Sequence, residues 1–588
     1  MIHWLLGAAA AAPFHPSFPV LDPSGVDVLT SGGAFSPART CGACHDVATI
    51  DRHATHGAAG ADAVGAPDRD GSLPWEWGPG LLGRWDADRY SPSDPGDLRA
   101  WAATYGQDHA GGGPLAPLGV ETDCVLCHLA TANDEQRRSA LARGGLGLAN
   151  TATLVGTGLV TLEPGGPRWD RAAFDGGRWP VERLPLGPAT PERCGSCHGS
   201  VHRDPSPLVE VDGRRTRATG LVYSGQRIDR SGLNLADKDT LDRAWDVHAE
   251  RLLACDDCHA AGNHPSRRVG DHAPSHLRFD PRAPPLGEYL TAPSHRLSSA
   301  EASCAGCHDP EVGHGFLPGR DVHFAALACA ACHVPDVRFT ARQQLDWTAL
   351  DADGQPLVDW RGTDGAPSDP RALHHGYTPA LLPVDGKLTP HHVSTTFLWV
   401  SGDAPVPRAA LAQVWADPTA LRPLDRDGDG ELTLVERRLD TPERAAVVAE
   451  RLRQLGVADP QIRGLLEVAP VSHGITRGAA VVRECTECHA PGGRLDRALE
   501  VAAWLPGGVV PEPRGGAAAA LGPVTVDQGA AWVRRPVDER YVFGAAGFLP
   551  LDGVGLAALL GSCLFALGHG GLRWWSTRRS GGPAGGTP

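Results

Sequence analysis

Cysteine and histidine residues recur along this chain in one short pattern. Between Cys304 and His333 the pattern Cys-x-x-Cys-His occurs twice, and His314 and His323 lie in the 20 residues between the two copies. Two thiols at this spacing can add across the two vinyl groups of a porphyrin, and the histidine that follows then lies under the iron as its proximal ligand. The pattern therefore predicts covalently attached haem c.

The pattern occurs seven times and uses 14 of the 15 cysteines. A zinc ribbon does not require a histidine directly after each Cys-x-x-Cys unit, and a disulfide framework has no such requirement either. We therefore expect seven haem c groups, with the seven histidines as proximal ligands. The attachment sites, numbered one to seven in chain order, are Cys41, Cys44 and His45; Cys124, Cys127 and His128; Cys194, Cys197 and His198; Cys255, Cys258 and His259; Cys304, Cys307 and His308; Cys329, Cys332 and His333; and Cys485, Cys488 and His489.

The distal iron ligands are predicted from the scarcity of other donors. Met1 is the only methionine, and Lys238 and Lys387 are the only lysines, so histidine is the default distal ligand and low-potential bis-histidine haems are expected. Any single histidine could equally be a surface or core residue. The candidates near a motif are His56, His202, His248, His264, His314, His323 and His473.

Composition indicates what kind of scaffold must hold these groups. The 588 residues include 73 glycines and 51 prolines, and only 6% are aromatic, so long regular elements and a conventional core should be scarce. We expect a mainly α-helical multihaem cytochrome c scaffold with extensive irregular coil and no large sheet, packed around the apolar haem faces. The formal net charge of -15 disfavours nucleic acid as a partner.

One acidic stretch matches a calcium-binding loop. In DRDGDGELTLVE, residues 425–436, the carboxylates of Asp425, Asp427 and Asp429 occupy positions 1, 3 and 5, Glu431 offers its carbonyl at position 7, and Glu436 is the bidentate ligand at position 12. An acidic surface loop without an ion is the alternative. Thr441 and Pro442 then predict the start of a helix that ends before Gly456.

Both ends of the chain carry apolar segments. Met1–Ala12 resembles a secretory signal, although no Lys or Arg precedes its apolar run. Val554–Leu572 is long enough to span a bilayer and is followed by Trp574, Trp575 and three arginines, which favours a cytoplasmic C-terminus. A buried amphipathic helix is the alternative. We interpret Cys563 as a small apolar residue of this span and His569 as an interfacial polar residue.

These features divide the chain into segments. The expected division is a signal-like segment (1–16), a multihaem domain with six sites (17–400), a helical insert with the calcium loop (401–470), the seventh site (471–500), a linker (501–548), a transmembrane helix (549–572) and a cytoplasmic tail (573–588). Haem c is attached outside the cytoplasm, so the haem domain is expected to be extracytoplasmic, in the periplasm, on a single-pass membrane protein.

The order and flanks of the motifs carry a family resemblance. The runs DCVLCH (123–128), DVHAERLLACDDCH (246–259), GRDVHFAALACAACHVP (319–335) and HGITRGAAVVRECTECH (473–489) resemble the octahaem tetrathionate reductase family of multihaem cytochromes c over residues 41–496. Members of that family have an eighth motif between the first and the DCVLCH motif. Its haem, which has a lysine ligand, is thought to be the active site, and this chain has neither cysteine nor lysine in that interval.

Two functions from different classes follow from the resemblance and the missing motif. The first is an electron-transfer protein that links a quinol-oxidising membrane cytochrome to a soluble redox partner and needs every iron six-coordinate. The second is a terminal reductase of tetrathionate or another sulfur or nitrogen oxyanion, which needs one iron with an exchangeable ligand. The family resemblance favours the second, and the missing motif favours the first.

Overall fold

The computed structural model describes residues 15–53, 56, 99, 102–103, 106–209, 218–258, 304, 308–402, 404–534 and 549–580. The segment Met1–Ala12 and the predicted site residues His259, His264 and Cys307 lie outside the described residues.

A mixed sheet forms the centre of the molecule. Its central strand, β8, is 15 residues long and is buried along most of its length; it pairs antiparallel with β10 and parallel with β5. The sheet has seven strands in the order β12-β10-β8-β5-β6, and β7 and β9 also pair with β8. The strands are β5 (Ala341–Leu350), β6 (Pro356–Arg361), β7 (Ala380–Val384), β8 (Lys387–Ser401), β9 (Ala404–Pro405), β10 (Pro460–Pro470) and β12 (Glu512–Pro513).

The register of β8 against β10 is fixed by packing as well as by hydrogen bonds. Phe397 lies opposite Gly464, where a Cβ atom would stand 2.6 Å from the Phe397 ring. A glycine is therefore required at this position, because any larger residue would displace the fully buried ring.

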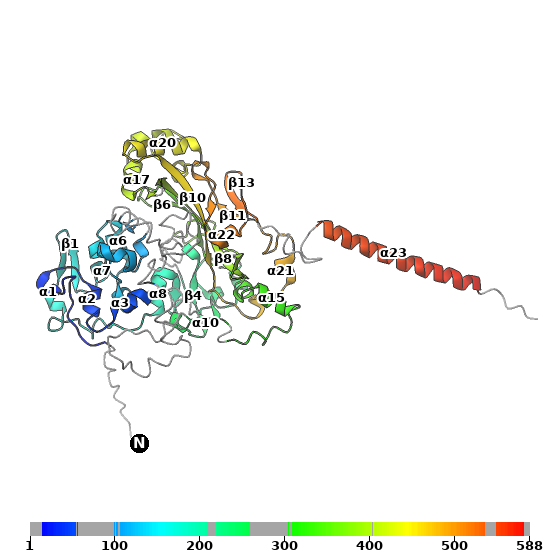
Figure 1. Ribbon diagram of the computed structural model, residues 1–588, viewed down its shortest axis with the longest axis horizontal. Coiled ribbons are helices and arrows are strands. Elements are labelled where there is room, and N and C mark those ends of the chain that lie inside the picture. The colour runs from blue at the N-terminus through cyan, green and yellow to red at the C-terminus, as the bar shows by residue number, and fades with distance from the viewer. Residues whose placement is uncertain are drawn as a thin grey trace, which may run out of the picture.

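Short helices make up the part of the chain before the sheet, which Figure 1 shows in blue to green. They are α1 (Val28–Ser31), α2 (Pro37–Cys41), α3 (Val47–His53), α5 (Cys124–His128), α6 (Asp134–Ala142), α7 (Ala149–Ala152), α8 (Pro191–His198), α10 (Val247–Glu250), α11 (Cys255–Cys258), α15 (Arg320–Ala326) and α16 (Ala330–His333). Two small pairs of strands accompany them, β1 (Val160–Glu163) with β2 (Gly166–Trp169) and β3 (Ser200–His202) with β4 (Val222–Ser224). Short 3-10 helices occur at Gly106–Asp108, Gly113–Leu118, Leu146–Leu148, Arg171–Ala173, Ile228–Arg230, Lys238–Thr240, Arg422–Leu424, Gly478–Ala480 and Pro506–Gly508.

A helical insert separates β9 from β10 and covers one end of the sheet (Figure 1). As predicted, Thr441 caps a helix that begins at Pro442, and Gly456 follows its end with φ +89°. The insert contains α17 (Arg408–Trp415), α18 (Pro418–Leu421), α19 (Leu434–Arg437) and α20 (Pro442–Gln454).

The C-terminal part contains the seventh site, a second sheet and one long helix. Around and within the segment expected as a linker (501–548), β11 (Leu499–Ala502), β14 (Ala530–Val533) and β13 (Val524–Asp527) form a three-stranded sheet in that order. They are accompanied by α21 (Cys485–His489) and α22 (Gly515–Ala519). The last helix, α23 (Leu549–Ser580), projects from the body in Figure 1.

The largest apolar core joins three parts of the chain. It contains Leu115 and Leu141 from the N-terminal part, Trp347 from the sheet, and Val448 and Leu452 from α20. Protein side chains therefore build a contiguous core beside the places where haem would attach.

The expectation of a mainly α-helical scaffold without a large sheet was wrong. The described residues contain several sheets, one of seven strands. Although Gly and Pro are abundant in the whole chain, the central strand has no glycine, and its Val, Thr, Phe and Trp residues favour extended backbone.

Candidate haem-binding site

Most attachment motifs fold as a single short helix. Helices α5, α8, α11, α16 and α21 each contain most of one Cys-x-x-Cys-His motif, and α2 ends at Cys41. Residues three apart on a helix lie on the same face, so each pair of thiols can reach one porphyrin edge. The described motif cysteines are half-buried or exposed and form no disulfide.

The attachment sites lie side by side in the order of the sequence. Helix α2, which ends at Cys41, contacts α5 and joins the first site to the second. The Cys304 and Cys329 thiols lie close enough to shift each other's pKa, which joins the fifth site to the sixth. Helix α5 contacts α8, and α8 contacts α11, which links the second, third and fourth sites. Cys258 raises the pKa of Cys304, which indicates that the fourth site lies near the fifth. Arg494, which follows the seventh motif, donates to the Ala331 carbonyl of the sixth.

Five of the six attachment histidines that the structure describes face a second imidazole. The members of each pair are at least 19 residues apart in the chain, and their ring centroids are 5.7 to 6.3 Å apart. The pairs are His45 with His15 (6.1 Å), His198 with His56 (5.7 Å), His308 with His248 (6.1 Å), His333 with His314 (6.1 Å) and His489 with His323 (6.3 Å).

These separations fit an iron between the two rings. Imidazole nitrogens bind metals at about 2 Å, so two axial imidazoles place their coordinating nitrogens about 4 Å apart and their ring centres about 6 Å apart. The Nε2 atoms of His56 and His198 are 3.4 Å apart. The paired histidines therefore fit the two axial ligands of a bis-histidine haem c. The His56–His198 pair would have to open slightly to admit the iron.

Hydrogen bonds hold several of these rings in a suitable tautomer. The Nδ1 atom of His333 lies 2.9 Å from the carbonyl oxygen of Thr476, and that of His323 lies 3.1 Å from the carbonyl oxygen of Gly319. When Nδ1–H donates to a carbonyl, the lone pair of Nε2 is available to a metal. His248 instead faces the buried carboxylate of Asp246, which raises the pKa of His248.

The facing histidines include four of the seven predicted candidates. Each of these four faces the histidine of a motif other than the one it lies next to in the sequence. His56 follows the first motif and faces His198 of the third; His314 follows the fifth motif and faces His333 of the sixth. A histidine close in sequence to one motif would thus be the distal ligand of the haem attached at another motif.

The other predicted candidates have different surroundings, and one facing histidine was missed. The Nδ1 atom of His202, in β3, lies 3.4 Å from the Ser224 hydroxyl, and His473 meets the ring of Tyr223 edge-on. His128 hydrogen-bonds the Gly187 carbonyl and faces no imidazole among the described residues. His15 was missed because no motif lies near it in sequence.

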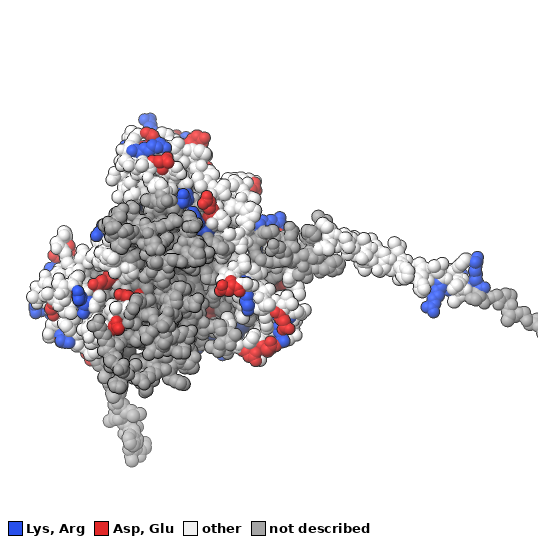
Figure 2. Space-filling model, in the orientation of Figure 1, with Lys and Arg blue, Asp and Glu red and all other residues white. Residues whose placement is uncertain are grey.

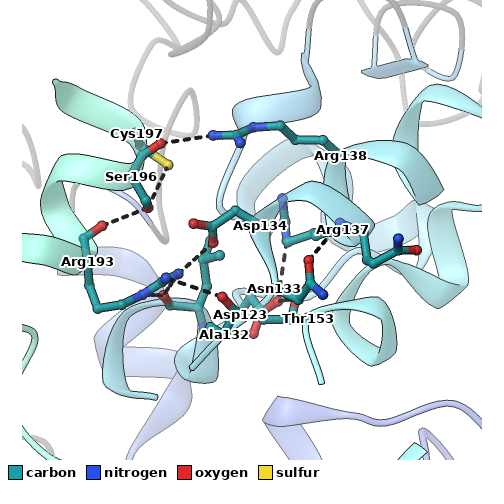
Figure 3. A network of polar contacts seen from close by, with 12 residues as sticks. Asp123, Ala132, Asn133, Asp134, Arg137, Arg138, Thr153, Arg193, Ser196 and Cys197 are labelled. Atoms are coloured by element: carbon teal, nitrogen blue, oxygen red, sulfur yellow. Dashed lines mark hydrogen bonds and ion pairs between the residues drawn. The ribbon is translucent and has the colours of Figure 1, made fainter. Parts of the chain in front are cut away.

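A polar network fixes the second site against the third (Figure 3). Asp123 caps α5 by accepting from Leu126 N, and its carboxylate also receives Arg137 Nε at 3.3 Å and the Thr153 hydroxyl at 2.6 Å. Asp123 and Arg137 are both buried. Burial raises the pKa of Asp123, whereas the Arg137 guanidinium and the Thr153 hydroxyl act in the opposite direction.

Two arginines extend this network from α6 to α8. Arg193, on α8, donates to the Leu126 carbonyl and to Asp134 of α6. Arg138 of α6 donates to the Ser196 carbonyl inside the third motif at 3.0 Å. Helix α6 therefore acts as a spacer that sets the separation of the second and third sites.

Residues just before and just after the seventh motif hold the sixth in place. Thr476 N donates to the His333 carbonyl at 2.8 Å, and the Arg494 guanidinium donates to the carbonyls of Ala331 and Val334. Gly474 N and Ile475 N donate to Asp246, which lies beside His248. The segment 474–476 therefore connects the neighbourhoods of three sites.

The predicted calcium loop has a compact arrangement of carboxylates. Oxygens of Asp425, Asp427 and Asp429 lie within 4.8 Å of one another. Gly430 has φ +88°, which suits a glycine at the sharp turn. Glu436 forms a capping box with Thr433 and accepts Arg426 N, and these hydrogen bonds lower the pKa of Glu436 to about 2.

Helix α23 contains the predicted span. Within Pro550–Arg579, the most apolar 18-residue window has a mean hydropathy of 1.8, and none of that window is buried against the body. In Figure 2 this helix is white along most of its length, with basic groups toward its far end. The Arg578 and Arg579 guanidinium groups lie 4.0 and 3.8 Å from the ring centres of Trp574 and Trp575, a pairing typical of a membrane interface.

No family model and no curated protein matches this sequence. Among solved structures, the chain is similar to an octaheme cytochrome c from Shewanella oneidensis, with a TM-score of 0.29 and 14% sequence identity over 68% of this chain and 79% of that chain.

Proposed function

We propose that this chain is a membrane-anchored, extracytoplasmic c-type cytochrome that holds seven haems in a row and transfers electrons along it. The observation that carries the proposal is the set of facing imidazoles at five predicted sites, together with the contacts that join the first four sites and the last two. Haem supplies the reversible one-electron chemistry when bound.

The chain's own residues would set the distances and potentials along the row. At the five sites with facing imidazoles, the two histidines would hold the iron from both sides and would favour a low reduction potential. The Asp123 and Arg193 network and the 474–476 segment hold neighbouring sites at fixed separations. Rigid spacing suits electron transfer because little needs to move when an electron passes.

Helix α23 supports a membrane location for this function. Its arginines follow the apolar stretch, which favours a cytoplasmic C-terminus and leaves the haem domain outside. We infer that electrons come from a quinol-oxidising membrane cytochrome and pass to a soluble partner.

A second candidate is a terminal reductase of tetrathionate or another sulfur or nitrogen oxyanion. One cleft of about 610 Å³ favours it, because Arg338, Arg494 and Arg497 line it beside the seventh motif. The Nε atoms of Arg338 and Arg494 are buried and have no hydrogen-bond partner among the described residues. Guanidinium groups bind oxyanions well.

An EPR spectrum of the oxidised, fully haem-loaded protein separates the two functions. The electron-transfer proposal expects low-spin signals that account for all seven irons. A high-spin signal equal to one iron per chain would favour the reductase. The same preparation, reduced by a viologen, should reoxidise slowly with tetrathionate; fast, catalytic reoxidation would overturn the electron-transfer assignment.

We also propose that the 425–436 loop binds one calcium ion. The support is the carboxylate cluster of Asp425, Asp427 and Asp429, with Glu436 held at the exit helix. A single loop of this kind suits a structural role for calcium in the insert, because sensors usually work as pairs.

A further inference from the structure

The first described residues of the chain pack against the body beside the first attachment site. Trp179 N donates to the Phe18 carbonyl at 2.8 Å, and the Ser17 hydroxyl donates to the Trp179 carbonyl at 3.0 Å. The rings of Phe18 and Trp179 stack at 5.4 Å with an interplanar angle of 17°. This contact joins residues about 160 positions apart and orders the chain immediately after His15.

The docked segment brings His15 to His45. Their ring centroids are 6.1 Å apart, the separation also found for the His248–His308 and His314–His333 pairs. The Nδ1 atom of His15 lies 2.8 Å from the Pro16 carbonyl oxygen. This leaves Nε2 as the coordinating atom. The His15 ring also meets the Phe18 ring edge-on, with 5.1 Å between the ring centroids, and this contact limits rotation of the His15 ring.

We propose that His15 is the distal iron ligand of the haem attached at Cys41 and Cys44. This inference rests on haem attachment as proposed above and adds a ligand that lies inside the signal-like segment expected at 1–16. Removal of a leading segment must then occur before His15. The strap formed by residues 15–18 would therefore be the N-terminal part of the mature protein, tied down by its ligand and by Trp179.

The orientation of the rings gives this site a distinct spectroscopic signature. The planes of His15 and His45 are 24° apart, whereas the other described pairs are 55 to 82° apart. Axial imidazoles that are nearly parallel give a rhombic low-spin EPR signal, and nearly perpendicular ones give a highly anisotropic signal. The first haem should therefore contribute to the rhombic signal.

The test is His15→Ala in the full-length protein. His375→Ala is the control, because the His375 ring pairs with the Asp364 carboxylate and not with an attachment histidine. Whole-protein mass should show seven haems in both variants. His15→Ala should lose one iron's share of the rhombic signal and gain one high-spin iron, and added imidazole should restore the low-spin state. The control should match the parent.

An unchanged EPR spectrum of His15→Ala with all seven haems attached would overturn the ligand assignment and leave the proposed function standing. A parent protein without covalent haem would overturn the proposed function itself. The mature N-terminus, determined by mass spectrometry on the parent, is a second measurement that does not depend on the folding of the variant. A mature chain that begins after residue 15 would exclude the proposal.

Discussion

At the scale of single residues, Asp123 has two structural tasks. It caps the helix of the second site and neutralises the buried Arg137 guanidinium. A buried charge without its partner is far more costly than an exposed one, because nothing replaces the lost hydration. One side chain therefore connects the local fold of an attachment motif to the stability of the helix next to it.

We predict that Asp123→Ala lowers the free energy of unfolding by about 3–5 kcal/mol. Glu163→Ala removes the exposed ion pair with Arg168 and should cost only about 0–1 kcal/mol. Denaturant unfolding monitored by far-UV circular dichroism measures both. Equal losses in the two variants would contradict the role assigned to the buried pair.

Asp346 is a second buried carboxyl with a measurable consequence. It is fully buried, and burial raises its pKa from 3.8 to about 6, although the Thr348 and Trp504 side chains hydrogen-bond it. Between pH 4 and 6 the folded state then holds a proton that the unfolded state has lost. As the pH rises through this window, Asp346 ionises in the unfolded state but stays protonated in the folded state, so the free energy of unfolding falls.

We predict that Asp346 makes the parent lose up to about 3 kcal/mol of stability between pH 4 and pH 6, with no further change due to this group above pH 6. Asp346→Asn cannot ionise, so the difference in stability between parent and variant should change across this window. Asp353→Asn, at an exposed position, is the control. A parent-to-variant difference that is constant with pH would show that the carboxyl does not titrate there.

At the scale of elements, the sequence predicted helices better than strands. Thr441 and Pro442 predicted the start of α20 because capping is a local signal. The strand β8 was missed because it is buried on both faces, so its sequence does not alternate between polar and apolar residues. Its partner β10 lies beyond the helical insert, and such long-range pairing leaves no local pattern. His391 and His392 of β8 belong to the sheet and not to a motif.

The calcium loop is the element whose proposed role is easiest to isolate. Asp425→Ala combined with Glu436→Gln should abolish bound calcium and increase local hydrogen exchange in residues 408–456, because the ligands at positions 1 and 12 are lost. Gln can still support the capping box of α19. The matched control is Glu450→Gln on the exposed face of α20. Elemental analysis that finds equal calcium in the double variant and the parent would contradict the proposed site.

At the scale of the whole molecule, the seventh predicted site lies nearest in sequence to α23, the helix that is long and apolar enough to span a membrane. Arg534, the last described residue before the gap at 535–548, pairs with Asp496, which follows the seventh motif closely. Fourteen residues span at most about 50 Å when extended. Arg534, which pairs with a residue close to the seventh motif, is therefore within that reach of the start of α23. The distal ligands were predictable as a set from the scarcity of methionine and lysine, but their assignment to sites depends on this global arrangement.

We predict that a chain that ends at residue 548 is released from the membrane as a soluble protein with all seven haems. The reason is that α23 makes no buried contact along its apolar window. Membrane fractionation followed by haem staining of a gel measures the release. Recovery of the shortened chain in the membrane fraction would show that another segment provides the anchor.

The contacts of residues 474–476 impose an order on biosynthesis. A chain exported from its N-terminus presents six motifs to the attachment machinery before this segment emerges. Asp246 and His333 acquire their hydrogen bonds to it only afterwards. These hydrogen bonds therefore form only after residues 474–476 have been made, so the last contacts of the fourth to sixth motif regions with this segment depend on a late part of the chain.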